Sequence, residues 1–173
     1  ADGSFTMRPN DDMPADYDPR TRPWYKDAMT AGGTTLTEPY IDAATKQLII
    51  TIATPAQSTG VVGGDLSLQT LVQIINSLDF DGMGYAFLVS SDGKILVHPN
   101  QDLVMKSLRD VFPKDTPRIT QELSEVELDG VTRLLTFAPV KGLPGVTWHV
   151  GLSIDKAKAY AMLSTFRTSA IIA

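Results

Sequence analysis

The chain has 173 residues, of which 43% are hydrophobic, and its formal net charge is -5. This length allows one elongated domain or two small modules with real cores. The acidic balance excludes a general nucleic-acid binder, which needs a clustered basic face. The absence of cysteine excludes a disulfide framework, a thiolate metal site and a cysteine nucleophile.

The two ends of the sequence suggest a piece of a larger protein. The start, "ADGSFTMRP", predicts a turn and a strand already under way, and the end, "FRTSAIIA", becomes apolar as the sequence stops. We find no signal peptide and no apolar run as long as a membrane span. We therefore expect an excised part of a protein that is anchored in a membrane.

Residues 34–57 predict a β-hairpin. A polar break at residues 44–46 separates an extended segment from the β-branched run Leu48 to Thr54, which is typical of a strand. After the turn "STG", the segment "VVGGDLSL" predicts a short strand that continues into a helix near Ser67. Apolar residues at helical spacing predict one buried face for this helix. They are Leu68, Leu71, Ile74, Ile75 and Leu78.

The pattern then restarts. The segment "GYAFLVSSDGKILVHPN" predicts two strands around the turn "SDGK". We expect short helices in "LRDVF" and "PRITQELSE", followed by a second hairpin formed by "VTRLLTFAPV" and "VTWHVGLSI". Trp148 alternates with valines in that hairpin, which predicts a packing role, and a last helix is expected to open at Asp155.

Each half therefore combines strands with helical inserts and ends in a helix. This repetition predicts an α+β fold of two similar modules, each an antiparallel sheet with flanking helices. We expect a first module at residues 1–80, a second at residues 81–154 and a C-terminal helix at residues 155–173.

The segment "YDPRTRPWYKDA" concentrates charges and aromatic rings before a predicted helix. The Arg22 guanidinium offers a planar fork of donors that matches a carboxylate, and the Trp24 indole can donate to the same group. Tyr25 and Tyr40 supply hydroxyls and ring faces that favour an ammonium. Asp65, at the glycine-rich end of a strand, can pair with an amine. The pattern predicts a site for a zwitterion.

A packing role for the same residues stays open at this point. A tryptophan-tyrosine pair at the start of a helix commonly serves the core or the surface. Arg20, Arg22, Lys26 and Asp27 are also compatible with a solvated helix end. Spacing alone does not choose between the two interpretations.

Four segments, which together cover nearly the whole chain, resemble the double Cache (dCache) ligand-binding domain of bacterial methyl-accepting chemoreceptors. They are "DPRTRPWYKDA", "EPYIDAATKQLIITIATPA", "GVVGGDLSLQTLVQII" and "GYAFLVSSDGKILVHPN". The resemblance implies two stacked PAS-like modules, with sensing in the membrane-distal one and transmission through the membrane-proximal one. It also implies a long N-terminal helix and a first transmembrane span, which are not among these residues, and a last helix that leads into a second span.

The amino-acid-binding members of that family are marked by a tyrosine, an arginine, a tryptophan-tyrosine pair and a later aspartate. The matching positions here are Tyr17, Arg22, Trp24, Tyr25 and Asp65, with Tyr40 as a further tyrosine of the site. The resemblance implies that Arg22 and Trp24 hold the ligand carboxylate, with Tyr17 nearby. Tyr25 and Asp65 would receive the α-amino group.

Three further polar positions need an interpretation. Asp42 follows Tyr40 by two residues, so we expect it on the same strand face, in reach of a ligand amine or side chain. His98 and His149 have no acidic or histidine partner in a recognised metal-binding spacing, and we expect structural roles for both. No catalytic constellation, cofactor or metal site is predicted.

The second module is expected to be filled by its own side chains, because the resemblance implies that this module usually has no ligand. The segment "FLVSSDGKILVHP" is nevertheless similar to Cache modules that bind small acids. A minor site in this module therefore stays open.

The sequence predicts the periplasmic sensor domain of an inner-membrane chemotaxis receptor that binds L-amino acids or a related amino acid such as γ-aminobutyrate (GABA). The other expected partners are a second receptor copy, with the C-terminal helix as a dimer or transmission surface, and cytoplasmic signalling proteins reached through an output domain. Nucleic acid is not expected. The alternatives are an amine or polyamine sensor dominated by Asp42 and Asp65, the input domain of a sensor kinase or cyclase, and an enzyme.

Overall fold

A computed structural model describes most of the chain, and it divides into two compact units. The described residues are 2–56, 60–78 and 80–162. The first unit comprises residues 1–71 with 141–147, and the second comprises residues 72–140 with 148–173. No helix within the described ranges is long and apolar enough to span a membrane.

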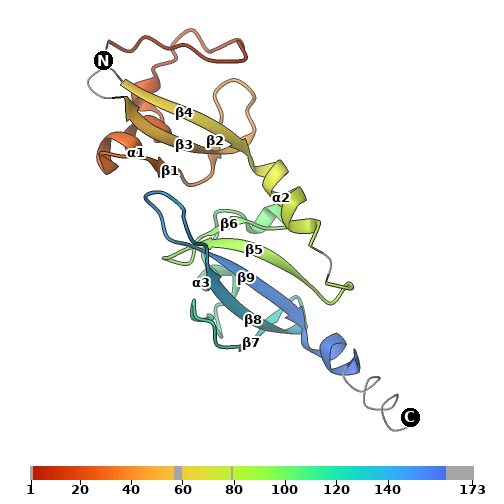
Figure 1. Cartoon of the computed structure of the whole chain (residues 1–173). Helices are drawn as coiled ribbons and strands as arrows, with labels where there is room; N and C mark the ends of the chain where they lie inside the picture. Colours follow the sequence, from red (N-terminus) through yellow and green to blue (C-terminus); the bar gives the residue numbers. More distant parts are fainter. Residues whose placement is uncertain (1, 57–59, 79, 163–173) are drawn as a thin grey trace, which may run out of the picture. The chain divides into compact units, whose positions relative to one another are not determined.

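Each unit contains its own antiparallel sheet with few helices (Figure 1). The predicted α+β class is therefore confirmed. The division into modules that end at residues 80 and 154 stays a prediction.

The sheet of the first unit is organised around β3 (Leu48–Ala56), whose β-branched residues favour extended backbone. It pairs with β1 (Thr35–Leu36), β2 (Tyr40–Ile41) and β4 (Gly60–Ser67), which confirms the predicted hairpin and its polar break. The segment "ADGSFTMRP", in which we expected a strand, forms none between residues 2 and 9.

Helix α1 (Pro23–Ala31) packs against β1, β3 and β4 and buries Ala28 completely. Pro23 suits its first turn because the missing N–H would have no partner there. The helix ends at Gly32, whose φ of 63° lies in the left-handed region that glycine adopts without strain.

Helix α2 (Leu68–Asn76) follows β4 at the predicted place. Leu68 and Val72 are buried, but Ile74 and Leu78 are 58% and 51% exposed. The single buried face that we predicted for this helix is therefore wrong at these two positions, because helical spacing identifies an apolar stripe but not the surface that covers it.

The second unit has a five-stranded sheet in the order β6-β5-β9-β8-β7. The strands are β5 (Gly84–Ser90), β6 (Ile95–Val97), β7 (Ser124–Leu128), β8 (Val131–Pro139) and β9 (Trp148–Asp155). Both predicted hairpins are confirmed, and Trp148 is buried as expected. Residues 156–162 are helical, and the remainder of the predicted C-terminal helix lies outside the described residues.

The segment between the hairpins differs in part from the prediction. A short helix, α3 (Leu108–Val111), forms in "LRDVF", with Ser107 and Asp110 making a capping box, and a 3-10 turn, η2, covers Gln101–Leu103. The helix expected in "PRITQELSE" is wrong, because Ser124 already begins β7. Polar and apolar residues alternate there, and Val126 faces the core while β8 satisfies the backbone.

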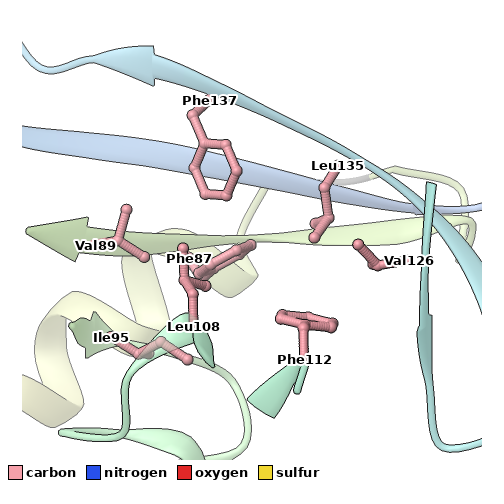
Figure 2. Close-up of a cluster of buried hydrophobic side chains, with 8 residues drawn as sticks. All are labelled: Phe87, Val89, Ile95, Leu108, Phe112, Val126, Leu135 and Phe137. Atoms are coloured by element: carbon pink, nitrogen blue, oxygen red, sulfur yellow. The ribbon is translucent and has the colours of Figure 1, made fainter. Parts of the chain in front are cut away.

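The core of the second unit lies between this sheet and the segment that contains α3. Figure 2 shows Phe137 and Leu135 of β8 and Phe87 of β5 gathered with Leu108 and Phe112. The rings of Phe87 and Phe137 meet edge-on with centroids 5.9 Å apart, a favourable aromatic geometry. These apolar side chains hold the sheet against the segment around α3.

His98 lies beside this core and is only 5% exposed. Its ring contacts the rings of Tyr85 and Phe87, with centroids 4.9 and 5.5 Å away. Burial lowers the pKa of His98 from 6.5 to about 4; a hydrogen bond with Asn100 acts in the opposite direction, and the charge of Arg133 adds to the lowering. His98 is therefore neutral at pH 7.

We expect Gly151→Ala to lower the free energy of unfolding by about 1–3 kcal/mol, the cost of overpacking a core. A Cβ atom at Gly151 would lie 2.5 Å from Cζ of Phe87, which is itself buried. Gly64→Ala is the control, because its nearest neighbour would be 3.7 Å away, on Ile52. Urea denaturation measures both, and equal losses would contradict the packing argument.

We also expect the free energy of unfolding to fall as the pH drops from 6.5 toward 4. As the pH falls, the unfolded chain takes up a proton on His98 before the folded chain does. The stabilisation that depends on neutral His98 is therefore complete above pH 6.5 and is lost as the pH falls toward 4. Urea denaturation across this range measures the fall, which should be smaller in His98→Gln. An identical pH dependence in wild type and variant would contradict the assignment.

Candidate functional site

The segment before α1 brings Arg22 to the start of the helix. Asp18 accepts a hydrogen bond from the backbone N–H of Arg20 at 2.9 Å and so caps the 3-10 turn η1 (Pro19–Thr21). Arg22 follows with extended backbone and is the N-cap residue of α1. Its side chain makes no capping hydrogen bond and extends from the junction of η1 and α1.

Arg22 connects this junction to strand β2, although the two are far apart in sequence. Its Nη2 donates to the carbonyl oxygen of Ile41 at 2.5 Å. Its guanidinium carbon lies 5.4 Å from the centroid of the Tyr40 ring, within the range of a cation–π contact. No acidic group in the described part of the chain forms an ion pair with Arg22. Its charge remains available to a ligand.

A chain of hydrogen bonds connects Tyr40 to Asp65 through Thr51. The hydroxyls of Tyr40 and Thr51 are 2.6 Å apart, and Thr51 donates to Oδ1 of Asp65 at 2.6 Å. Since the one Thr51 proton goes to the carboxylate, Tyr40 donates to Thr51. Oδ2 of Asp65 has no partner among the described residues, and Asp65 is exposed. It can accept from an ammonium.

Tyr17 and Tyr40 stay protonated. Burial raises the pKa of both Tyr17 and Tyr40, the latter strongly. In both cases the charge of Asp65 adds to this rise and the charge of Arg22 opposes it, so both charged groups act on the same pair of hydroxyls. The arrangement is a dipole: a cation and a carboxylate that do not pair with each other, separated by neutral donors.

Aromatic rings form a wall beside these polar groups. Phe5 lies 4.9 Å from Tyr17 and 6.3 Å from Trp24, measured between ring centroids, and Trp24 meets Tyr25 edge-on at 5.8 Å. Trp24 also approaches β4, since a Cβ atom at Gly63 would lie 3.5 Å from its ring and 3.0 Å from the Thr51 methyl. Gly63 thus lets the indole lie close to the hydrogen-bond chain.

The structure brings together most of the residues that the sequence singled out. Tyr17, Arg22, Trp24, Tyr40 and Asp65 form one connected group. Tyr25 joins it through the ring of Trp24.

Asp42 stabilises the turn between β2 and β3. Its Oδ2 accepts hydrogen bonds from the backbone N–H of Thr45 at 2.8 Å and from the Thr45 hydroxyl at 2.7 Å. Burial acts to raise its pKa, but the hydrogen bonds that stabilise the carboxylate prevail and lower it. Asp42 also acts electrostatically on Tyr17, so it lies near the group while serving the turn. Its role toward a ligand stays a prediction.

Sequence reasoning missed two members of the group, Thr51 and Phe5. Thr51 is 1% exposed and alternates with the buried residues Ile49 and Ala53. A hydroxyl on the buried face of a strand needs a partner, and that signal was readable. Phe5 gave no comparable signal, because its neighbours have no regular secondary structure. Within the described residues, no cluster of His, Asp and Glu could hold a metal ion.

Residues 1–163 match the family model for Cache domains of the dCache type. The chain is a dCache domain. It is 65% identical over 176 residues to the methyl-accepting chemotaxis protein PctB of Pseudomonas aeruginosa. It is also 65% identical over 173 residues to McpG of Pseudomonas putida. Both matches cover 99% of this chain, which spans 28% of the length of each relative. The resemblance drawn from the sequence is confirmed.

Solved structures have the same fold. The ligand-binding domain of P. aeruginosa PctB in complex with L-Arg matches with a TM-score of 0.88 and 65% identity, over 92% of this chain and 70% of that one. The ligand-binding domain of P. aeruginosa PctC in complex with GABA matches with a TM-score of 0.72 and 54% identity, over 88% of this chain and 70% of that one.

We expect Thr51→Val to lower the free energy of unfolding by about 1–3 kcal/mol, since Tyr40 and Asp65 each lose a partner while the volume is kept. Urea denaturation measures the loss. Thr54→Val is the control, because this threonine lies in the same strand and, among the described residues, its hydroxyl forms a hydrogen bond only with the exposed Thr34. An unchanged stability in Thr51→Val would contradict the hydrogen-bond chain.

Proposed function

We propose that this dCache domain binds free amino acids in their zwitterionic form and is the sensory part of a chemotaxis receptor. The observation that carries the proposal is the separation of Arg22 from Asp65 by Tyr40 and Thr51. A ligand with a carboxylate and an ammonium complements both charges at once. A ligand with one charge leaves the other pole unpaired.

Each pole has a chemical preference. Arg22 retains donors that match a carboxylate in a bidentate manner, and the indole N–H of Trp24 and the hydroxyl of Tyr17 are close to it. Asp65 offers its free oxygen to the ammonium, with Tyr25 as a second contact and the Tyr40 ring between the two poles. Asp42 is the proposed contact for a more distant amine or a ligand side chain.

The comparisons support the same ligand class. The relatives are named as chemotaxis proteins, and the solved neighbours hold L-Arg and GABA. These two molecules differ in length and in side chain but share one carboxylate and at least one cationic amine. A site that recognises a ligand by its carboxylate and its ammonium explains how similar domains bind both molecules.

The domain would act outside the cytoplasm, as the periplasmic part of an inner-membrane receptor. A ligand shifts a signalling equilibrium only through its different affinity for two conformations. We propose that binding at the dipole favours one arrangement of the first unit, and that the second unit and the C-terminal helix pass the change to the membrane. In the full receptor, a homodimer would deliver the signal to cytoplasmic partners through an output domain beyond this chain.

An amine or polyamine sensor is the second candidate, because Asp65 is exposed and retains a free oxygen. Arg22 argues against it, since a cation gains nothing from an unpaired guanidinium nearby. The input domain of a sensor kinase would use the same site with another output. Recovery of unchanged ligand after incubation, measured by mass spectrometry, separates all of these sensors from an enzyme.

The test is calorimetric titration of the domain with L-amino acids, GABA and putrescine. We expect amino acids to bind, and Arg22→Ala to weaken them by about 100-fold because a charge-assisted bidentate contact is lost. Arg20→Ala is the matched control: Arg20 is exposed, pairs with Asp18 at 2.8 Å and should not change affinity. Thermal unfolding verifies that each variant is folded.

Binding of putrescine alone, with an affinity that Arg22→Ala leaves unchanged, would overturn the proposal and favour the amine sensor. Equal losses in Arg22→Ala and Arg20→Ala would also contradict it, because the effect would then come from the segment and not from the guanidinium in contact with Tyr40.

A further inference from the structure

Phe5 is an aromatic residue in a part of the first unit that has neither helix nor strand. The structure shows no regular element between residues 2 and 16, and Phe5 is 38% exposed. Its ring nevertheless packs against the rings of Tyr17 and Trp24, with centroids 4.9 and 6.3 Å away. Aromatic pairs at these separations are favourable. Packing against these two rings thus places Phe5 in a segment where no strand or helix does so.

The two partners of Phe5 come from different segments. Tyr17 precedes the 3-10 turn η1, whereas Trp24 lies in the first turn of α1. The two side chains nevertheless meet, because the Trp24 indole N–H lies close enough to the Tyr17 hydroxyl to act on its pKa. No single helix or strand sets the distance between them. Phe5 contacts both rings and so constrains their relative position.

These contacts lie at the carboxylate pole of the proposed site. Burial raises the pKa of Tyr17, and the Trp24 indole and the charge of Arg22 oppose this rise. The charges of Asp42 and Asp65 add to it. Water is thus already partly excluded from the Tyr17 hydroxyl. The attraction between a guanidinium and a carboxylate grows as water is excluded, because the effective dielectric constant falls. An apolar ring beside these groups therefore favours the binding of a carboxylate.

We propose that Phe5 is a positioning residue of the amino-acid site. It holds Tyr17 and Trp24 in the arrangement in which the hydroxyl and the indole N–H both face the ligand carboxylate, and it keeps water from these two groups. Phe5 need not touch the ligand, because it acts through the two residues that it contacts. The inference rests on the proposed function of this site, and it gives a role to a residue outside the motif by which the sequence resembles the amino-acid-binding members of the family.

Calorimetric titration measures this role. The wild-type domain is titrated with each of the proteinogenic L-amino acids, and the one that binds most tightly is used for the variants. We expect Phe5→Ala to weaken it by about threefold to tenfold, the effect of losing an aromatic contact. Phe5→Leu keeps a large apolar side chain and should restore most of the affinity.

Val62→Ala is the matched control for the loss of an exposed apolar side chain. Val62 is 62% exposed and lies in β4. Its neighbour Gly63 lies on the side of Trp24, so Val62 faces the other side of the sheet. We expect the affinity of this variant to equal that of the wild type.

A spectroscopic measurement without ligand tests the contact itself. The Trp24 indole N–H is followed by nuclear magnetic resonance, and its resonance is the one lost in Trp24→Phe. We expect its exchange with water to be faster in Phe5→Ala than in the wild type and near the wild-type rate in Phe5→Leu. The indole of Trp148, which is buried in the second unit, should keep its rate. The wild type should also show nuclear Overhauser contacts from the Phe5 ring to the rings of Tyr17 and Trp24, a result that depends on no variant.

A double-mutant cycle separates a positioning role from a general effect on folding. Tyr17→Phe keeps the ring that Phe5 contacts but removes the hydroxyl that it positions. If Phe5 acts through this hydroxyl, Phe5→Ala should weaken binding less in the Tyr17→Phe background than in the wild type. Thermal unfolding verifies that each variant is folded.

Equal affinities in the wild type and a folded Phe5→Ala would overturn this inference alone. An unchanged exchange rate of the Trp24 indole, absence of the Overhauser contacts, or full additivity in the cycle would do so as well. A wild-type domain that binds none of the amino acids would instead overturn the proposed function, and with it any role of Phe5 in binding. The two failures are therefore distinguishable.

Discussion

The antiparallel pairing of β3 with β4 is the constraint on which the candidate site depends. Its register sets Thr51 opposite Asp65, so that the threonine hydroxyl bridges Tyr40 and the carboxylate. A slip of one residue would turn Asp65 to the other face of the sheet and break the bridge. Because Thr51 is buried, its hydroxyl needs a partner, and the same hydrogen bonds satisfy the interior and orient the acceptor.

The separation of Arg22 from Asp65 leaves both charged groups able to contact a ligand. An arginine and an aspartate that paired with each other would have little interaction left for a ligand. Here Arg22 contacts a backbone carbonyl and the Tyr40 ring, while Asp65 contacts a hydroxyl. Burial keeps Tyr17 and Tyr40 protonated, so neutral donors lie between the two poles. A zwitterion can pair with both ends without displacing an internal ion pair.

Both units use a guanidinium over a tyrosine ring, with different partners. In the first, Arg22 lies over Tyr40, and the carboxylate of Asp65 completes a dipole. In the second, Arg133 lies over Tyr85 and donates hydrogen bonds to the hydroxyl and the carbonyl oxygen of Ser153. In the first arrangement Asp65 is connected to Tyr40 through Thr51, whereas in the second no carboxylate of the described residues pairs with Arg133.

The sequence by itself determined the α+β class, the hairpins, helix α1 and the family, because strand alternation, turn residues and motifs are local in the chain. It also singled out Arg22, Tyr40 and Asp65 as candidates from their side-chain chemistry, and their roles toward a ligand stay predictions. It was wrong where a segment gained structure from a distant partner, as when β7 formed against β8 in place of a helix. Only the tertiary structure decided that Thr51 connects Tyr40 to Asp65, that Asp42 stabilises a turn and that Arg133 pairs with no acid among the described residues. Each of these depends on which strands lie side by side, and strand register is set by packing over the whole sheet and not by any one segment.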